Sequence, residues 1–124
     1  MIFLIILLDQ VMKFLVSKDI ILSFHKNYGA AFSVLQGQTW LFILTALFFI
    51  ALIIANYRKI PGDTSVQAGF ALFTAGTVSN LIDRLFRGYV IDYFNFRLFN
   101  NNIADIAITI GAAIIIYYFL FKKK

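Results

Sequence analysis

The sequence predicts an all-α membrane protein in which four transmembrane helices carry a small outward-facing β or interfacial region. Of the 124 residues, 61% are hydrophobic and 14% are charged, whereas soluble domains are about half apolar and about a quarter charged. The apolar residues also gather in four blocks, 1–16, 40–57, 66–82 and 103–121. We expect a single domain over residues 1–124, because so short a chain has too little interior to hide this surplus from its solvent.

The four blocks differ in how well they match a membrane span, which needs about 20 helical residues. Blocks 40–57 and 103–121 are nearly free of polar residues, and block 66–82 is rich in small residues. Block 1–16 is shorter and is interrupted by polar side chains. We expect a helix of the mature protein there and not a signal peptide, because no basic residues precede it and no small-residue cleavage site follows it.

Four spans would place both termini on one side of the membrane. The connection 58–63 and the terminal lysines 122–124 would then share the cytoplasmic side, and connections 17–39 and 83–102 would face outward. Basic residues do not decide this orientation, because both sides carry similar numbers of them. Aromatic residues are dense in the outward connections, as is typical of a membrane interface. Residues 88–94 fit a short strand or an interfacial strip equally well.

The residue inventory excludes several kinds of chemistry. The chain has no cysteine and one histidine, His25, so a thiol nucleophile or a zinc site made by the protein is not expected. No zincin helix motif and no serine nucleophile elbow occur. The net charge of +5 is not arranged as a basic stripe, so nucleic acid is not an expected partner. Acid–base catalysis by aspartate is the chemistry that this inventory leaves.

Two polar groups interrupt the apolar blocks. Asp9 and Lys13 are four residues apart with the acid first, which is the favourable order on a helix, and we expect them to pair and to anchor the first helix. Asn80, Asp83 and Arg84 share one face of the third helix, where a functional cluster is the favoured interpretation. Arg84 is expected to reach another carboxylate or a lipid phosphate, since it does not face its neighbour Asp83.

Small residues recur at helical spacing in the third and fourth blocks. The pattern predicts close helix packing; its members are Ala71, Ala75, Gly76 and Ser79 in the third block, and Ala107 and Gly111 in the fourth.

Asp92 and Asp105 both fall at the expected outer membrane boundary. If their carboxyl groups are close together, they cannot both ionise cheaply, so one keeps a proton and the other acts as a base. Such a pair can activate a water molecule and protonate a leaving amine. Spacing alone leaves open that they are two unrelated interfacial residues, one of which caps the fourth helix.

Five motifs together resemble those of bacterial lipoprotein signal peptidases, also called signal peptidase II. Each is short, but they occur in the family's order from the first helix to the fourth. They are D-Q-x-x-K at 9–13, N-x-G-A-A-F-S at 27–33, N-x-x-D-R at 80–84, V-x-D-Y at 90–93 and N-x-A-D at 102–105.

This resemblance implies an aspartic endopeptidase of the membrane with Asp92 and Asp105 as its catalytic pair. It implies that five polar residues and a glycine orient the pair and the substrate, and that Asp9 and Lys13 support the fold around them. The orienting residues would be Asn27, Gly29, Asn80, Asp83, Arg84 and Asn102.

The resemblance also implies a substrate, a location and an inhibitor. The reaction would be hydrolysis of a prolipoprotein signal peptide just before a diacylglyceryl-modified cysteine. The enzyme would lie in the bacterial cytoplasmic membrane as a monomer, in contact with lipid, with both termini cytoplasmic and the site near the outer leaflet. Cyclic peptides of the globomycin type would inhibit it, and no metal or organic cofactor is implied.

Two other functions would leave different patterns in the sequence. A transporter with an aspartate proton relay would spread its carboxylates through the membrane depth, whereas most of those in this sequence fall at one boundary. A non-catalytic homologue would have lost one of the pair, and both Asp92 and Asp105 are present.

Overall fold

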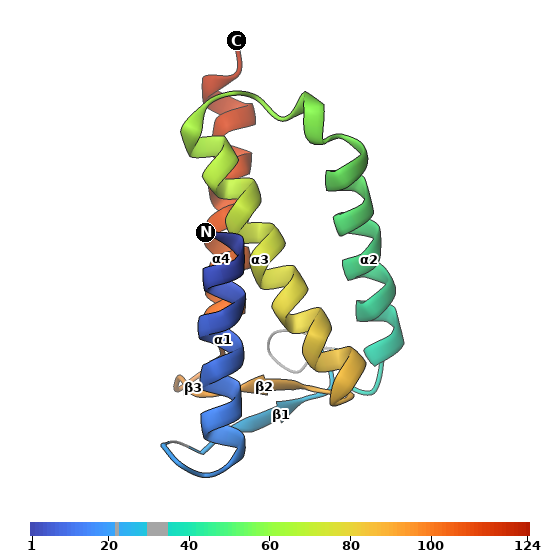
Figure 1. The fold of residues 1–124 in the computed structure, drawn as a ribbon, viewed down its shortest axis with the longest axis vertical. Coiled ribbons are helices and arrows are strands. Elements are labelled where there is room, and N and C mark those ends of the chain that lie inside the picture. The colour runs from blue at the N-terminus through green and yellow to red at the C-terminus, as the bar shows by residue number, and fades with distance from the viewer. Residues whose placement is uncertain (22, 30–34) are drawn as a thin grey trace.

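The computed structural model describes residues 1–21, 23–29 and 35–124. Within them, long helices run roughly along one axis and short strands lie at one end (Figure 1). The helices are α1 (Ile2–Ser17), α2 (Thr39–Ala55), α3 (Thr64–Phe86) and α4 (Ile103–Tyr117), and α4 continues as the π-helical turn η3 (Tyr118–Lys122). The predicted helical class with a small β region is confirmed.

Helix α3 is longer than the predicted block 66–82 because polar residues define both of its ends. Asp63 caps its start by accepting hydrogen bonds from the backbone N–H groups of Ser65 and Val66, at 2.9 and 3.3 Å. At its other end the N–H of Gly88 donates to the carbonyl of Asp83, and Gly88 has a φ of +82°. A left-handed residue just beyond the last turn is a common way for a helix to stop, and glycine adopts it without strain.

Two short antiparallel ladders form beneath the helices. Strand β1 (His25–Asn27) pairs with β2 (Val90–Asp92), so that His25 lies opposite Asp92. Strand β3 (Phe94–Asn95) pairs with β4 (Asn100–Asn101). Residues 88–94 therefore contain strand, which decides between the two alternatives that the sequence left open. All three residues of β2 are buried, so this strand is an inner element of the fold.

Helices α3 and α4 pack closely through glycines. A Cβ atom placed on Gly111 would lie 2.6 Å from the carbonyl oxygen of Gly69, and one placed on Gly76 would clash with the carbonyl oxygen of Ala104. Small residues let two backbones approach in this way. The predicted packing stripe is confirmed at Gly76 and Gly111, and it fixes the start of α4 against the polar half of α3.

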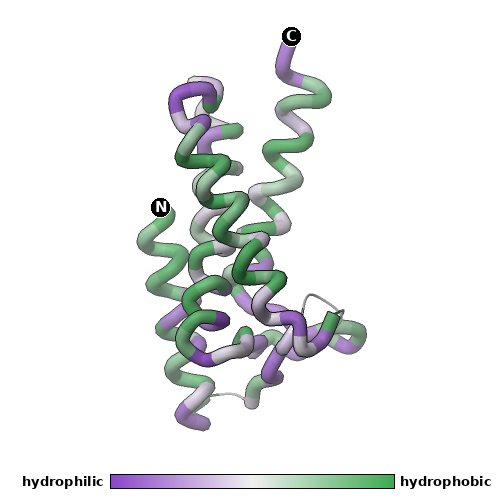
Figure 2. The backbone as a smooth tube through the Cα atoms, turned by 90° about the vertical axis from the view of Figure 1, so that its right-hand side faces the viewer, coloured by the Kyte–Doolittle hydropathy of each residue, from purple (hydrophilic) through white to green (hydrophobic). Residues whose placement is uncertain are grey.

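The outer surface of the helices is apolar, and polar side chains are buried inside one end of the molecule. Phe3, Ile54 and Leu120 are 77%, 70% and 68% exposed, whereas Asp9 and Lys13 are completely buried. Apolar stretches dominate the middle of the helices, and polar segments gather toward the ends of the molecule (Figure 2). This is the reverse of a soluble domain and is the arrangement that a lipid environment favours.

Length and composition single out one span within the described residues. Ile103–Lys122 is 20 residues long and apolar, and α2 is apolar but has 17 residues. The span at the C-terminal end is thus confirmed by this criterion, and the count of four remains a prediction.

Candidate active site

Asp92 lies at the end of β2 and is 2% exposed. Two amide side chains donate hydrogen bonds to its carboxylate. Nδ2 of Asn102 lies 3.0 Å from Oδ1, and Nδ2 of Asn27 lies 3.2 Å from Oδ2. The pairing of β1 with β2 is what brings Asn27 to this carboxylate from 65 residues earlier in the chain.

Asp105 lies in the first turn of α4 and is partly exposed. Its Oδ1 accepts a hydrogen bond of 2.8 Å from Nδ2 of Asn80 on α3. Its backbone N–H donates to Oδ1 of Asn102 at 2.9 Å, which is the N-cap bond of α4. The open alternative that an aspartate caps this helix is therefore replaced by an asparagine cap.

Asn102 connects the two aspartates through one completely buried side chain. Its oxygen binds the backbone of Asp105, and its nitrogen reaches Asp92, the carbonyl of Ile91 at 3.1 Å and Oδ1 of Asn80 at 3.3 Å. An amide nitrogen has only two hydrogens for these acceptors, so the side chain has a single orientation that satisfies its surroundings. Asn102 thereby links the carboxylate of Asp92 to the backbone of α4 at Asp105.

The surroundings of Asp92 favour its protonated form. Burial is the largest influence and the charge of Asp105 is the next, and together they raise the pKa of Asp92 to about 7. Hydrogen bonds from Asn27 and Asn102 and the charge of Lys13 oppose this rise. The charge of Asp105 therefore acts on Asp92.

Lys13 is the buried cation behind the pair. Its Nζ lies 2.6 Å from Asp9 and 3.0 Å from Asp83, and it donates to Oδ1 of Asn80 at 3.0 Å. The predicted Asp9–Lys13 pair is confirmed. An ammonium group can only donate, so the oxygen of Asn80 must face Lys13 and its nitrogen must face Asp105. Lys13 thus fixes the amide that holds Asp105.

Several members of this buried network were missed from the sequence. Ser79 was predicted as a packing residue only, yet its Oγ donates to Asp9 at 2.7 Å. Tyr93 donates from its hydroxyl to Asp9 at 2.6 Å and accepts from the N–H of Ile103 at 3.0 Å. Gln10 and Arg87 both bind Oδ1 of Asp83, at 3.0 and 2.6 Å. Two of them offered a signal, because Gln10 lies beside Asp9 in an apolar block and Arg87 follows Asp83 at the four-residue spacing that predicted the Asp9–Lys13 pair.

Asp83 joins this network to the strand that carries Asp92. Its Oδ2 accepts from the backbone N–H of Ile91 at 3.0 Å, while the same carboxylate binds Lys13 and Arg87. The predicted polar face of α3 therefore exists at Asn80 and Asp83, and both residues act on the neighbourhood of the carboxyl pair.

Arg84 has a different contact from the one expected. Its Nη2 donates to the carbonyl of Gly29 at 3.1 Å, and its guanidinium lies 5.1 Å from the ring centre of Phe42. Gly29 also donates its N–H to Oδ1 of Asn27 at 2.9 Å. Arg84 and Gly29 thus hold the segment that presents Asn27 to Asp92. The rest of that motif, residues 30–33, lies outside the described residues.

The two carboxyl groups and their amide donors are suited to acid–base chemistry. Asn27 and Asn102 donate to the carboxyl group of Asp92, Asn80 donates to that of Asp105, and burial favours the protonated form of Asp92. In the described part of the chain, no three His, Asp or Glu side chains gather as a metal site would require. The carboxyl groups are the reactive groups that this site offers.

Comparison with known proteins gives a consistent result. The family model described as "Signal peptidase (SPase) II" matches residues 1–121. The chain is 37% identical to the lipoprotein signal peptidase of Halothermothrix orenii, over 97% of this chain and 92% of that one. It is 39% identical to the lipoprotein signal peptidase of Streptococcus agalactiae serotype Ia, over 84% of this chain and 70% of that one. A solved bacterial membrane enzyme has the same fold, with a TM-score of 0.88 and 25% identity over 99% of this chain and 88% of that one.

Proposed function

This chain belongs to the signal peptidase II family, and we propose that it is an aspartic endopeptidase whose catalytic pair is Asp92 and Asp105. Its reaction is hydrolysis of a prolipoprotein just before the diacylglyceryl-modified cysteine, which releases the signal peptide. The observation that carries this proposal is the bridge made by Asn102, whose oxygen binds the backbone of Asp105 while its nitrogen binds the carboxylate of Asp92.

The proposal assigns one proton to the pair. Burial raises the pKa of Asp92 to about 7, so this carboxyl group can carry that proton near neutral pH, and Asp105 is given the role of base. Asp105 removes a proton from water while the water oxygen attacks the scissile carbonyl carbon. The proton on Asp92 passes to the nitrogen of the leaving amine as the C–N bond breaks, which completes the hydrolysis.

The supporting residues act by holding the two carboxyl groups. Asn27, Asn80 and Asn102 donate hydrogen bonds to them, and Lys13 fixes Asn80. Asp9 and Asp83 balance the charge of Lys13. Arg84 and Gly29 hold the segment of Asn27, as a site that is preorganised for its transition state requires.

We further propose that all four helices cross the bacterial cytoplasmic membrane. Both termini are cytoplasmic, and the strand end, with Asp92 and Asp105, lies near the outer leaflet. Large exposed apolar side chains on the helices support lipid contact. A lipid-modified substrate then reaches the site by lateral diffusion. Because a single chain supplies every residue of the site, a monomer suffices.

Cleavage of a synthetic diacylglyceryl-modified prolipoprotein by the purified protein in liposomes tests the proposal. Asp92→Asn and Asp105→Asn should each lower kcat by about 10²- to 10⁴-fold, the usual size of acid–base contributions. Asp63→Asn is the matched control, because Asp63 caps α3 at the other end and asparagine also caps helices. A globomycin-type cyclic peptide should inhibit the wild type. Undiminished cleavage by both site variants would refute the catalytic assignment.

A further inference from the structure

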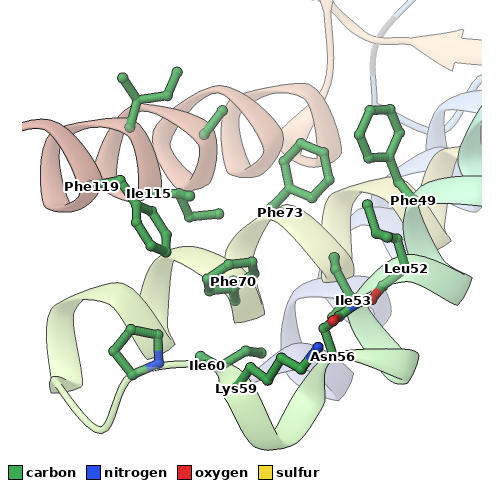
Figure 3. A pocket seen from close by; sticks show the side chains of 13 residues that line it. Phe49, Leu52, Ile53, Asn56, Lys59, Ile60, Phe70, Phe73, Ile115 and Phe119 are labelled. Carbon is green, nitrogen blue, oxygen red and sulfur yellow. Dashed lines mark hydrogen bonds between the residues drawn. The ribbon is translucent and has the colours of Figure 1, made fainter. Parts of the chain in front are cut away.

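A pocket opens between α2, α3 and α4, away from the carboxyl pair (Figure 3). Its volume is 570 Å³, within the range of about 300–1,000 Å³ that is typical of small-ligand sites. Its wall is almost entirely apolar, with Asn56 and Lys59 at one end (Figure 3). The wall includes Leu52, Ile53, Phe70, Phe73, Ile115 and Phe119.

The polar end of the pocket lies at the end of the molecule opposite the strands. Lys59 ends the short 3₁₀ turn Tyr57–Lys59 in the connection from α2 to α3, which is far from β1 and β2 (Figure 1). On α4 the wall begins at Ala112, seven residues beyond Asp105, or about 10 Å along the helix. A ligand with its polar group at Lys59 therefore belongs to the leaflet opposite the catalytic pair.

Charge at this end favours an anionic ligand. Five basic residues, Arg58, Lys59, Lys122, Lys123 and Lys124, lie there with a single acidic one, Asp63. Asp63 is already bound to Lys122 at 3.0 Å. In the part of the chain that the structure describes, Lys59 has no acidic partner within ion-pair distance.

We propose that this pocket binds an anionic phospholipid of the cytoplasmic leaflet. An acyl chain lies between the aromatic and aliphatic side chains of the three helices, and the phosphate accepts a hydrogen bond from Lys59. Basic groups beside an apolar space between helices are suited to such head groups. A substrate would instead place the polar part of its lipid-modified cysteine at Asp92 and Asp105. That end of the molecule is far from Lys59, so a substrate bound there would not bring its head group to this lysine. The proposal depends on the membrane orientation given above and not on the catalytic assignment.

Lipid binding by the full-length protein in detergent solution, followed by native mass spectrometry, tests this site. The probes are phosphatidylglycerol and phosphatidylcholine with identical acyl chains. The wild type should retain phosphatidylglycerol preferentially, and Lys59→Gln should lower its affinity for that lipid by about fivefold, as expected for one basic residue at an anionic head group. Lys124→Gln removes the same charge at the same end outside the pocket and should leave the preference unchanged.

A second variant separates the pocket from its charge. Ala112→Phe fills the apolar space and should weaken the binding of both lipids alike, with the helical circular dichroism unchanged. Equal binding of both lipids by the wild type would overturn the proposal, and so would an unchanged preference in Lys59→Gln. Displacement of phosphatidylglycerol by the lipidated prolipoprotein would also overturn it, because the substrate would then be the occupant. None of these measurements requires cleavage, so their failure would leave the catalytic proposal intact.

Discussion

Two pairs of aspartates, Asp9 with Asp83 and Asp92 with Asp105, lie within the same end of this protein, and their partners differ. Asp9 and Asp83 contact cations, with Lys13 between them and Arg87 on Asp83. In the described residues no lysine or arginine forms an ion pair with Asp92 or Asp105, and amide side chains hold them instead. The first group is paired with cationic side chains, whereas the second is held in position by neutral amides.

In the proposed mechanism, this difference separates carboxylates that support the fold from carboxylates that take part in the reaction. A direct cation keeps a buried carboxylate ionised and thereby removes it from proton transfer. An amide donor orients a carboxyl group at a smaller cost to its proton affinity, so Asp92 can have a pKa of about 7. The paired group stabilises the fold, and the amide-bound group remains able to exchange a proton.

The largest effect, on the free energy of unfolding, is expected from removing Lys13, the cation between Asp9 and Asp83. Lys13→Met leaves Asp9 and Asp83 buried with one ammonium fewer, and the loss of one partner of a buried pair costs about 3–5 kcal/mol. The free energy of unfolding in detergent, measured by denaturant titration, should fall by that amount. Lys18→Met is the control, since Lys18 follows α1 and is exposed. A Lys13 variant as stable as the wild type would mean that the pairing does not stabilise this protein.

A smaller effect, on catalysis rather than on stability, is expected at Asn80, whose side chain contacts both Lys13 and Asp105. Asn80→Ala removes the donor to Asp105, and a hydrogen bond to a charged group contributes about 1.5–3 kcal/mol. The value of kcat/KM should therefore fall by about 10- to 150-fold. Asn95→Ala, an exposed position in β3, should leave kcat/KM unchanged. If Asn80→Ala lowers the free energy of unfolding as much as Lys13→Met does, the stabilising and the catalytic roles of these residues cannot be separated.

The smallest effect is a shift in pH dependence at Asn27. The Asn27 hydrogen bond lowers the pKa of Asp92, against the larger effect of burial, so Asn27→Ala should raise that pKa further. Asp92 then keeps its proton to higher pH, and the alkaline limb of kcat/KM against pH should move upward by up to about one unit.

A matched variant identifies the cause of that shift. Gln36→Ala removes a partner of Asn27 while the bond from Asn27 to Asp92 remains, and it should leave the limb near its original position. A limb that moves to lower pH in Asn27→Ala would contradict the role given to this hydrogen bond.

The sequence predicted the elements that depend on local patterns. Apolar blocks placed all four long helices, the four-residue spacing gave the Asp9–Lys13 pair, and small residues gave the packing of α3 against α4. Helix ends were less accurate, because α3 is extended by the Asp63 cap and by the polar turns beyond residue 82. Those extensions depend on single capping residues within polar stretches.

Contacts between distant segments could not be predicted from local patterns. Tyr93 reaches Asp9 across 84 positions and Ser79 reaches it across 70, and neither residue type indicates such a partner. The packing of α1 against α3 and α4 decides both contacts. The carboxyl pair was named from motif order and not from spacing, because the residues between Asp92 and Asp105 form a small hairpin whose return no periodicity reveals.

Asn102 couples the folding of α4 to the assembly of the candidate site. The same side chain nucleates α4 and binds Asp92, so the last helix cannot begin one residue early or late without separating the two acids. With Asp92 and Asp105 as the proposed catalytic pair, we expect competence for hydrolysis to be acquired in the same step as the folding of the C-terminal helix. Protection of the Asp105 amide from hydrogen–deuterium exchange should consequently rise in parallel with the first appearance of cleavage during refolding.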